Sequence, residues 1–354
     1  MKKRIFLVFI LLIISTFCFA ANKKTVSDKD FVIKNGVLIK YKGKRADVVI
    51  PNSVKKIDSF AFSENKSLKS VVIPNSVKSI EGDLMEGGAF ASCTNLTSVT
   101  IAGSVTKIGH SAFVYCEKLS KLTLSEGLVT ISRGAFNGCE SLSIVKIPNS
   151  VKSIEAYAFC DTGISEITIP ANVKNVEACA FMTCDKLLEI NVDTENKTYH
   201  SLDGVLFSKD MTKIVAYPTA KKDIEYFIPS SVSRIGSFAF YDSIFLEKVE
   251  MSNNLKSINI FAFYGCKNLK NIIISNSAKE IGYRAFENCY KLEEITIPDS
   301  VVKLGLIEFD KGYGKVEVEE GPVFDGCNNL TLYCKSGSVA HLHAQEYNIR
   351  FELI

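Results

Sequence analysis

The sequence predicts a repeat solenoid with a parallel β-sheet on one face, and three features lead to this fold class. The pair Ala-Phe recurs along the chain, most steps between its phenylalanines are 22 or 23 residues, and a Cys usually follows three residues after the Phe. A constant period of this length is typical of units that bury their apolar face only against neighbouring units. Their constant spacing predicts a stacked aromatic spine in the core. The recurring phenylalanines, the last of them in a Val-Phe pair, are Phe62, Phe90, Phe113, Phe136, Phe159, Phe181, Phe240, Phe263, Phe286 and Phe324.

Each unit has three parts. An alternating segment such as Leu119-x-x-Leu122-x-Leu124 indicates a short strand with one buried face. A second aliphatic pair follows, and the Phe comes five residues after its last member. Six strands run into Ile-Pro, and because Pro has no ladder N–H it is expected where a strand ends and the chain turns. These prolines are Pro51, Pro74, Pro148, Pro170, Pro229 and Pro298.

The motif I-P-x-S-V-x-x-I followed by A-F-x-x-C resembles the BspA-type leucine-rich repeat proteins of bacterial surfaces. It is matched closely from residue 147 to 159 and again from 297 to 301, and the resemblance covers roughly residues 31–354. It implies a leucine-rich repeat solenoid. It also implies an exported, adhesin-like binding protein whose protein ligand belongs to host matrix, host cell surface or other bacteria. The alternative is a structural or scaffolding envelope protein that self-associates.

Two Gly turns between apolar residues divide the chain. Asn35-Gly36 and Asp203-Gly204 are strong hairpin signals, so we expect a hairpin cap at the start that is repeated in the middle. At the far end Ser338 is a plausible N-cap for a short helix that ends near Asn348. The expected regions are a signal peptide (1–20), a polar leader (21–30), a β-hairpin cap (31–51), a first array (52–193), a hairpin-rich insert (194–227), a second array (228–333) and a C-terminal cap (334–354).

The first twenty residues predict export. Lys2, Lys3 and Arg4 precede an almost wholly apolar stretch that ends near Ala20, which is the pattern of a cleaved secretory signal. A lipoprotein acylated at Cys18 is the alternative, although a bulky Phe precedes that Cys. The three basic residues account for the whole net charge of +3. The processed chain is therefore formally neutral, without a transmembrane anchor or a net charge that favours nucleic acid. Surface, secreted and periplasmic locations all stay open.

Ten cysteines remain after such processing, and seven occupy the same place in their repeats. We expect these seven to be buried free thiols that point the same way, with disulfides between adjacent turns as the alternative. The sequence assigns no role to Cys160, Cys179 and Cys334, and the absence of a C-x₂-C pair argues against metal. The seven repeated cysteines are Cys93, Cys116, Cys139, Cys184, Cys266, Cys289 and Cys327.

The sequence contains no convincing catalytic, cofactor or metal motif, so we do not expect an enzyme. His341 and His343 are two residues apart on the expected cap helix and are interpreted as surface residues. His200 is interpreted in the same way. His110 precedes Ser111, but no acid is placed to orient it.

Two surfaces are candidates for partner binding. The first is the outward row of the expected strands, with Thr100, Thr123, Lys146 and Thr168, for which a merely solvated sheet is the alternative. The second is ranked higher. Two repeats carry insertions at the same register, residues 81–88 and 305–322, and insertions at one register emerge on one face. The longer insertion carries Asp310, Lys311, Tyr313, Glu317, Glu319 and Glu320.

Overall fold

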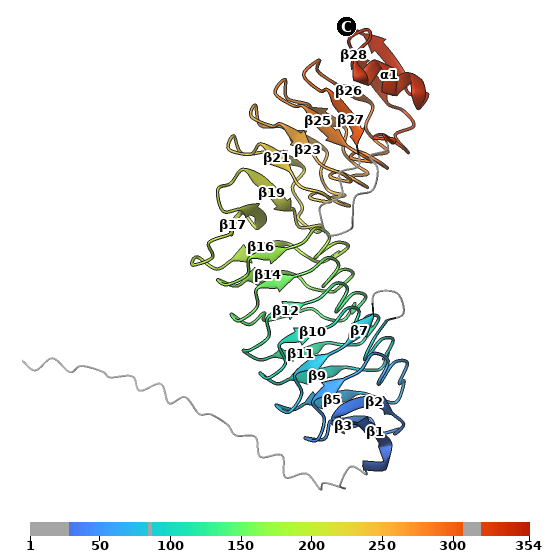
Figure 1. The fold of residues 1–354 in the computed structure, drawn as a ribbon. Helices are drawn as coiled ribbons and strands as arrows, with labels where there is room; N and C mark the ends of the chain where they lie inside the picture. Colours follow the sequence, from blue (N-terminus) through green and yellow to red (C-terminus); the bar gives the residue numbers. More distant parts are fainter. Residues whose placement is uncertain (1–27, 84–86, 307–319) are drawn as a thin grey trace, which may run out of the picture.

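The computed structural model describes residues 28–83, 87–306 and 320–354. Its turns stack along one axis into an elongated, curved solenoid (Figure 1). Neighbouring turns pair in parallel one period apart, as where Lys107 pairs with Thr130, so the predicted solenoid is confirmed. The expected signal peptide and most of the expected leader lie outside the described residues.

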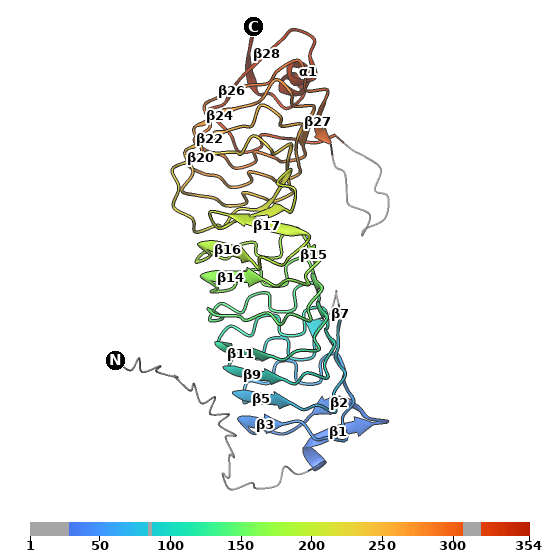
Figure 2. The same ribbon diagram turned by 90° about the vertical axis from the view of Figure 1, so that its left-hand side faces the viewer.

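Parallel sheets run along two faces of the solenoid, where the sequence predicts one. The second aliphatic pair of each turn also forms a strand, usually of two residues. These strands build two long sheets along one side, opposite the short sheets of the Leu-x-Leu segments (Figure 2). Two residues are too few to show an alternating pattern, which is why the sequence does not reveal the long sheets.

The first long sheet consists, in spatial order, of β1 (Phe31–Lys34), β2 (Val37–Tyr41), β4 (Lys56–Ile57), β6 (Ser79–Ile80), β10 (Lys107–Ile108), β12 (Thr130–Ile131), β13 (Ser153–Ile154) and β15 (Asn175–Val176). The second consists of β17 (Tyr199–Leu202), β18 (Val205–Ser208), β19 (Lys213–Ala216), β21 (Arg234–Ile235), β23 (Ser257–Ile258), β25 (Glu280–Gly282) and β27 (Lys303–Leu306).

The short sheets are formed by β11 (Lys121–Leu124), β9 (Ser98–Ile101), β5 (Ser70–Ile73) and β3 (Asp47–Val49); by β14 (Glu166–Ile169) and β16 (Glu189–Val192); by β20 (Glu225–Phe227), β22 (Lys248–Glu250) and β24 (Asn271–Ile273); and by β26 (Glu294–Thr296), β28 (Thr331–Cys334) and β29 (Arg350–Leu353). The strand expected around Val145 is not formed, and this gap separates β11 from β14. A 3₁₀ turn, η1 (Asp28–Asp30), precedes β1.

Five of the six Ile-Pro pairs follow a short strand and all six open a turn; the exception is Pro148, which follows the segment where no strand forms. The Pro carbonyl accepts a hydrogen bond from the aliphatic residue three positions later, as Pro51 does from Val54, at 2.9–3.2 Å in all six cases. Ala102 makes the same bond with Val105, so the turn does not require Pro.

The repeated phenylalanines form a stacked spine through the core, as predicted. Consecutive rings lie 4.7–6.0 Å apart between centroids within each array, a spacing that suits stacked aromatic pairs. Seven of the Phe N–H groups also donate to the carbonyl oxygen of the Ala in the next turn, for example from Phe90 to Ala112 at 2.8 Å, and that of Phe286 donates to Val323. The Ala is fully buried in this close backbone contact, which explains why the two residues recur together.

Two hydrophobic cores meet at the hairpin of β18 and β19. One extends from Phe31 to Leu206, and the other begins at Val205. Strand β18 supplies both, because Leu206 packs into the first core while Val205 and Phe207 pack into the second. Strand β18 is therefore buried on both faces and forms a common wall.

Both Gly turns close antiparallel hairpins, β1–β2 at Asn35-Gly36 and β17–β18 at Asp203-Gly204. Equating these two hairpins is nevertheless wrong. The strand that joins the parallel stack is β2 in the first case and β19 in the second. Tyr41, at the end of β2, and Tyr217, just after β19, each stack on the first Phe of an array at 4.9 Å. The counterpart of β1–β2 is thus β18–β19, and β17 is an additional strand.

The C-terminal end contains the expected helix, α1 (Val339–Glu346). The hydroxyl of its N-cap residue, Ser338, accepts a hydrogen bond from the His341 N–H at 3.2 Å. The prediction of a surface position is wrong for His343, which is 5% exposed. Its ring packs edge-on against Phe324 and close to Tyr347. It therefore closes the aromatic spine, and burial lowers its pKa to about 4.

Candidate interaction surfaces

The short sheets bring part of the predicted outward row together. Thr100 of β9 and Thr123 of β11 are paired neighbours on one sheet. Thr168 lies beyond the gap, on β14, where it pairs with Asn191. Lys146 lies within the gap itself, exposed and outside any strand. The predicted residues therefore follow one side of the first array, but they belong to two sheets.

The same outward row contains apolar residues that the sequence analysis missed. Val49 and Val72 pair on β3 and β5 and are 53% and 39% exposed. Phe227 of β20 and Ile273 of β24 are 60% and 67% exposed, and both pair with Glu250 of β22. Strict alternation along these strands would have indicated that the four residues are exposed. Successive side chains of a strand point to opposite faces, so the neighbours of a buried residue point outward. The row is therefore less polar than predicted.

Charged side chains around Phe227 and Ile273 form ion pairs with one another. Lys248 Nζ lies 3.7 Å from Glu225 and 4.0 Å from Glu250, and it also approaches the Phe227 ring at 5.7 Å. Lys270 pairs with Glu247 at 2.7 Å and holds the pKa of that carboxyl below its usual range. Exposed apolar side chains with charge pairs beside them resemble the centre and rim of a protein interface.

The higher-ranked insertion is described only at its base. Asp310, Lys311, Tyr313, Glu317 and Glu319 lie outside the described residues. Glu320 is exposed and forms an antiparallel bridge with Leu306.

The two ends of this insertion already lie side by side. The Gly321 N–H donates to the Gly305 carbonyl oxygen at 3.0 Å. The base of the shorter insertion is likewise an antiparallel pair, β7 (Gly82–Asp83) with β8 (Gly87–Gly88). Both bases follow a long-sheet strand and lie on the same side of the solenoid (Figure 2).

The seven repeated cysteines are buried and face the same way. Each thiol donates to the carbonyl oxygen of the Phe in the preceding turn, as Cys116 does to Phe90, at 3.0–3.2 Å. All ten cysteines that the structure describes are free. Burial raises the pKa of Cys93 to about 12 and that of Cys184 to about 11, which disfavours the reactive thiolate.

Of the unassigned cysteines, Cys160 and Cys334 are buried and Cys179 is half-buried. The Cys160 sulfur lies 3.2 Å from the Thr183 hydroxyl. Burial raises the pKa of Cys179 to about 12. Within the described parts of the chain, no three His, Cys, Asp or Glu side chains are grouped to hold a metal ion.

An acid lies near His110 but does not hydrogen-bond to it. Glu155 Oε2 is 3.9 Å from His110 Nδ1, which is too long for a hydrogen bond. The same oxygen accepts a hydrogen bond from the Arg133 N–H at 3.0 Å. The Glu155 carboxylate is thus held by the backbone of Arg133, in the turn that lies between those of His110 and Glu155.

A small cavity lies where the two arrays meet, lined among others by Phe181, Val215, Tyr217 and Tyr241. Its volume of about 30 Å³ leaves space for roughly one water molecule. This cavity is too small for an organic ligand, so the broad outer faces are better candidates for binding.

Comparison with known families identifies the repeat. The model of the BspA type leucine rich repeat region matches residues 39–87, 84–211 and 199–313, with six copies. The chain belongs to this family. None of the curated proteins matches it significantly.

Solved structures of bacterial leucine-rich repeat proteins are similar to this chain. One from Eubacterium ventriosum is 26% identical over 77% of this chain and 68% of its own, with a TM-score of 0.63. A leucine rich cell surface protein from Faecalibacterium prausnitzii is 28% identical over 89% and 94%, with a TM-score of 0.60. The pneumococcal vaccine antigen PcpA is 28% identical over 81% of this chain, with a TM-score of 0.59, and this chain spans 62% of that antigen.

Among the helices in the described ranges, none has both the length and the apolar character needed to cross a bilayer.

Proposed function

We propose that this protein is an exported, non-enzymatic, adhesin-like protein that binds a protein ligand through the outer side of its short sheets. The family and its cell-surface relatives support a protein-binding role. The partner class is a component of host matrix, host cell surface or another bacterium.

The observation that carries this proposal is the exposed pair Phe227 and Ile273. Large apolar side chains on a rigid sheet, flanked by paired charges, are the usual anchors of a protein interface. Their positions are fixed by backbone pairing to β22, so little conformational entropy is lost when a partner binds them.

The longer insertion is a second, separate candidate surface, because its base lies on the long-sheet side, and it keeps its rank above Thr100, Thr123, Lys146 and Thr168. Because residues 305 and 321 already pair, a two-residue Asn-Gly turn between Leu306 and Glu320 should close the shortened loop without disturbing the solenoid.

The test is a pull-down with residues 21–354 against matrix and envelope protein fractions, followed by measurement of Kd for the captured protein. Phe227→Ala combined with Ile273→Ala should weaken binding at least about 30-fold, because truncation of interface anchors typically costs 2 kcal/mol or more. The shortened-loop variant should also weaken it. Ile144→Ala, which is 76% exposed in the gap of the first array, is the matched control and should leave binding within about twofold.

Two outcomes would move or replace the proposal. If the apolar double variant binds as well as the parent while combined Thr100→Ala, Thr123→Ala and Thr168→Ala fails, the site belongs on the first array. If the chain captures only copies of itself, the self-associating scaffold is the correct function.

A further inference from the structure

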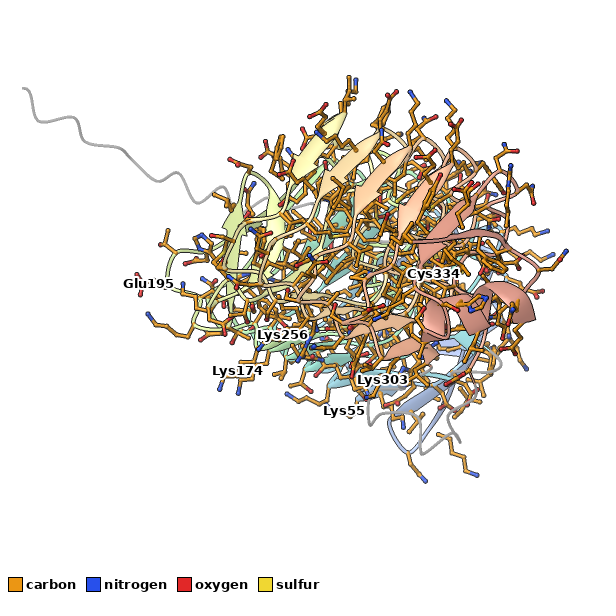
Figure 3. The ribbon with its side chains drawn as sticks, turned by 90° about the horizontal axis from the view of Figure 1, so that it is seen from above. Lys55, Lys174, Glu195, Lys256, Lys303 and Cys334 are labelled. Atoms are coloured by element: carbon orange, nitrogen blue, oxygen red, sulfur yellow. The ribbon has the colours of Figure 1, made fainter. Side chains whose placement is uncertain are left out.

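A band of basic side chains, two neighbouring positions wide, runs along the long-sheet side of the solenoid. We call it the basic column. Its members occupy the same segment of eight turns and are all exposed: Lys55, Lys78, Lys107, Lys152, Lys174, Arg234, Lys256 and Lys279. Figure 3 shows Lys55, Lys174 and Lys256, with Lys303 nearby, along one side of the molecule viewed down its axis.

Backbone hydrogen bonds place these residues one above another. The Lys78 N–H donates to the Lys55 carbonyl at 2.8 Å, that of Lys174 to Lys152 at 2.9 Å, and that of Lys279 to Lys256 at 2.8 Å. Turns paired in this way lie about 4.8 Å apart. Six of the eight members share this register, whereas Lys107 and Arg234 lie one residue later and align with Ser79 and Ser257. The column is interrupted where Val129 takes its position and again in the insert between the arrays.

Within the described residues, the charges of the column have no intramolecular counter-ions. None of its eight members is within ion-pair distance of an acidic group in the part of the chain that the structure describes. The nearby acids are engaged elsewhere: Glu81 pairs with Lys56, Glu280 with Lys303, and Glu177 accepts from the Ala156 N–H. On the opposite side, by contrast, Lys248 and Lys270 are paired.

Hydroxyl and amide side chains stand next to the column. Ser79 follows Lys78, Ser153 follows Lys152, and Asn175 follows Lys174. The same pattern continues at Thr106–Lys107, Ser233–Arg234 and Lys256–Ser257. Each of these turns thus offers one cation and one neutral hydrogen-bonding group.

We propose that the basic column binds a linear sulfated polysaccharide. Such a polymer carries regularly spaced anions together with hydroxyl groups, which matches the cation and hydroxyl of each turn. A column no more than two neighbouring positions wide fits a single extended chain. Seven of the eight cations are Lys, which acts as a point charge and does not need the two-pronged geometry that Arg provides.

Single-stranded nucleic acid is the competing polyanion and fits less well. Proteins that bind it combine a basic groove with aromatic side chains that stack on the bases. The column residues are interleaved with Ser, Thr, Asn and aliphatic residues and contain no aromatic side chain.

The test measures the binding of residues 21–354 to heparin as a function of NaCl concentration. The column variant combines Lys78→Gln, Lys107→Gln, Lys152→Gln and Lys174→Gln. The matched control combines Lys66→Gln, Lys69→Gln, Lys121→Gln and Lys186→Gln, which removes the same charge from exposed positions at and beside the short-sheet strands. Thermal unfolding should be nearly unchanged in both, because exposed substitutions rarely affect stability.

The column variant should bind heparin at least about tenfold more weakly at low salt, with a shallower salt dependence, because fewer counterions are released. The control should stay within about threefold. Equal losses in the two variants, or no loss in the column variant, would overturn the proposal. Displacement of heparin by single-stranded DNA at equal charge concentration would assign the column to nucleic acid instead. Phe227→Ala with Ile273→Ala should leave heparin binding intact, which separates this proposal from the protein-binding one.

Discussion

The two arrays use the same repeat but are closed in different ways. The aromatic stack of the first runs from Phe31 and Tyr41, in the β1–β2 hairpin, to Phe181. The stack of the second starts at Tyr217 and ends under helix α1, where His343 lies against Phe324. Between them, β18 serves both cores through alternate side chains.

This difference shows where stability can be lost independently. In a solenoid each turn is stabilised mainly by its immediate neighbours. Phe181 ends the first aromatic stack and Tyr217 begins the second, so a defect in the middle of one stack should weaken that stack first. The arrays should behave as two cooperative units that share one wall.

The largest expected effect is the removal of a ring from the middle of a stack. Phe136 is fully buried between Phe113 and Phe159, at 5.3 and 5.5 Å, and Phe136→Ala should cost about 3–5 kcal/mol. Phe263→Ala removes the equivalent ring from the second array. Hydrogen exchange should show lost protection in residues 52–193 for the first variant and in 228–333 for the second. Uniform loss across both arrays in either variant would show that the chain unfolds as one unit.

The second-largest expected effect is a loss of stability of the second array at low pH. Burial lowers the pKa of His343 to about 4, so between this value and about 6.5 the unfolded chain binds a proton that the folded chain does not. Stability from the neutral ring is therefore complete above pH 6.5 and is lost as the pH falls, by about 3 kcal/mol at pH 4. His343→Phe keeps the aromatic contact and should reduce this loss in a pH series of urea unfolding. A parallel decline in parent and variant would attribute the acid sensitivity to carboxylates.

The sequence predicts the features that repetition makes visible. The Phe spine, the Cys positions and the Ile-Pro turns recur in a common register, so each position reports one environment many times over. The Asn-Gly and Asp-Gly hairpins and the Ser338 cap follow from local turn and capping chemistry, which does not depend on distant contacts.

The features that the sequence does not predict depend on contacts with residues that are distant in the sequence. His343 reads as a polar helix residue, and only the end of the Phe stack beneath it explains its burial. The Gly turns suggest that the hairpins are equivalent, whereas pairing to the next turn shows that β19 takes the role of β2. Phe227 and Ile273 do alternate with buried residues, but an exposed aromatic residue in a repeat that buries its phenylalanines is easily assigned to the core.

The smallest expected effect is at the seven repeated cysteines. It tests whether both arrays bury these residues in the same way, as free thiols. Cys139 donates to the Phe113 carbonyl, which also accepts the Cys116 N–H at 3.3 Å. Cys139→Ala leaves that carbonyl satisfied, so the free energy of unfolding should fall by only about 1 kcal/mol.

The native thiols should react slowly at pH 8 because burial raises their pKa values, with half-buried Cys179 the first to react. Denaturation without reductant should then expose at least the seven ladder thiols, four from the first array and three from the second. If few free thiols appear, adjacent turns are joined by disulfides in the exported protein. The interpretation of the repeated cysteines as parallel, hydrogen-bonded thiols is then wrong.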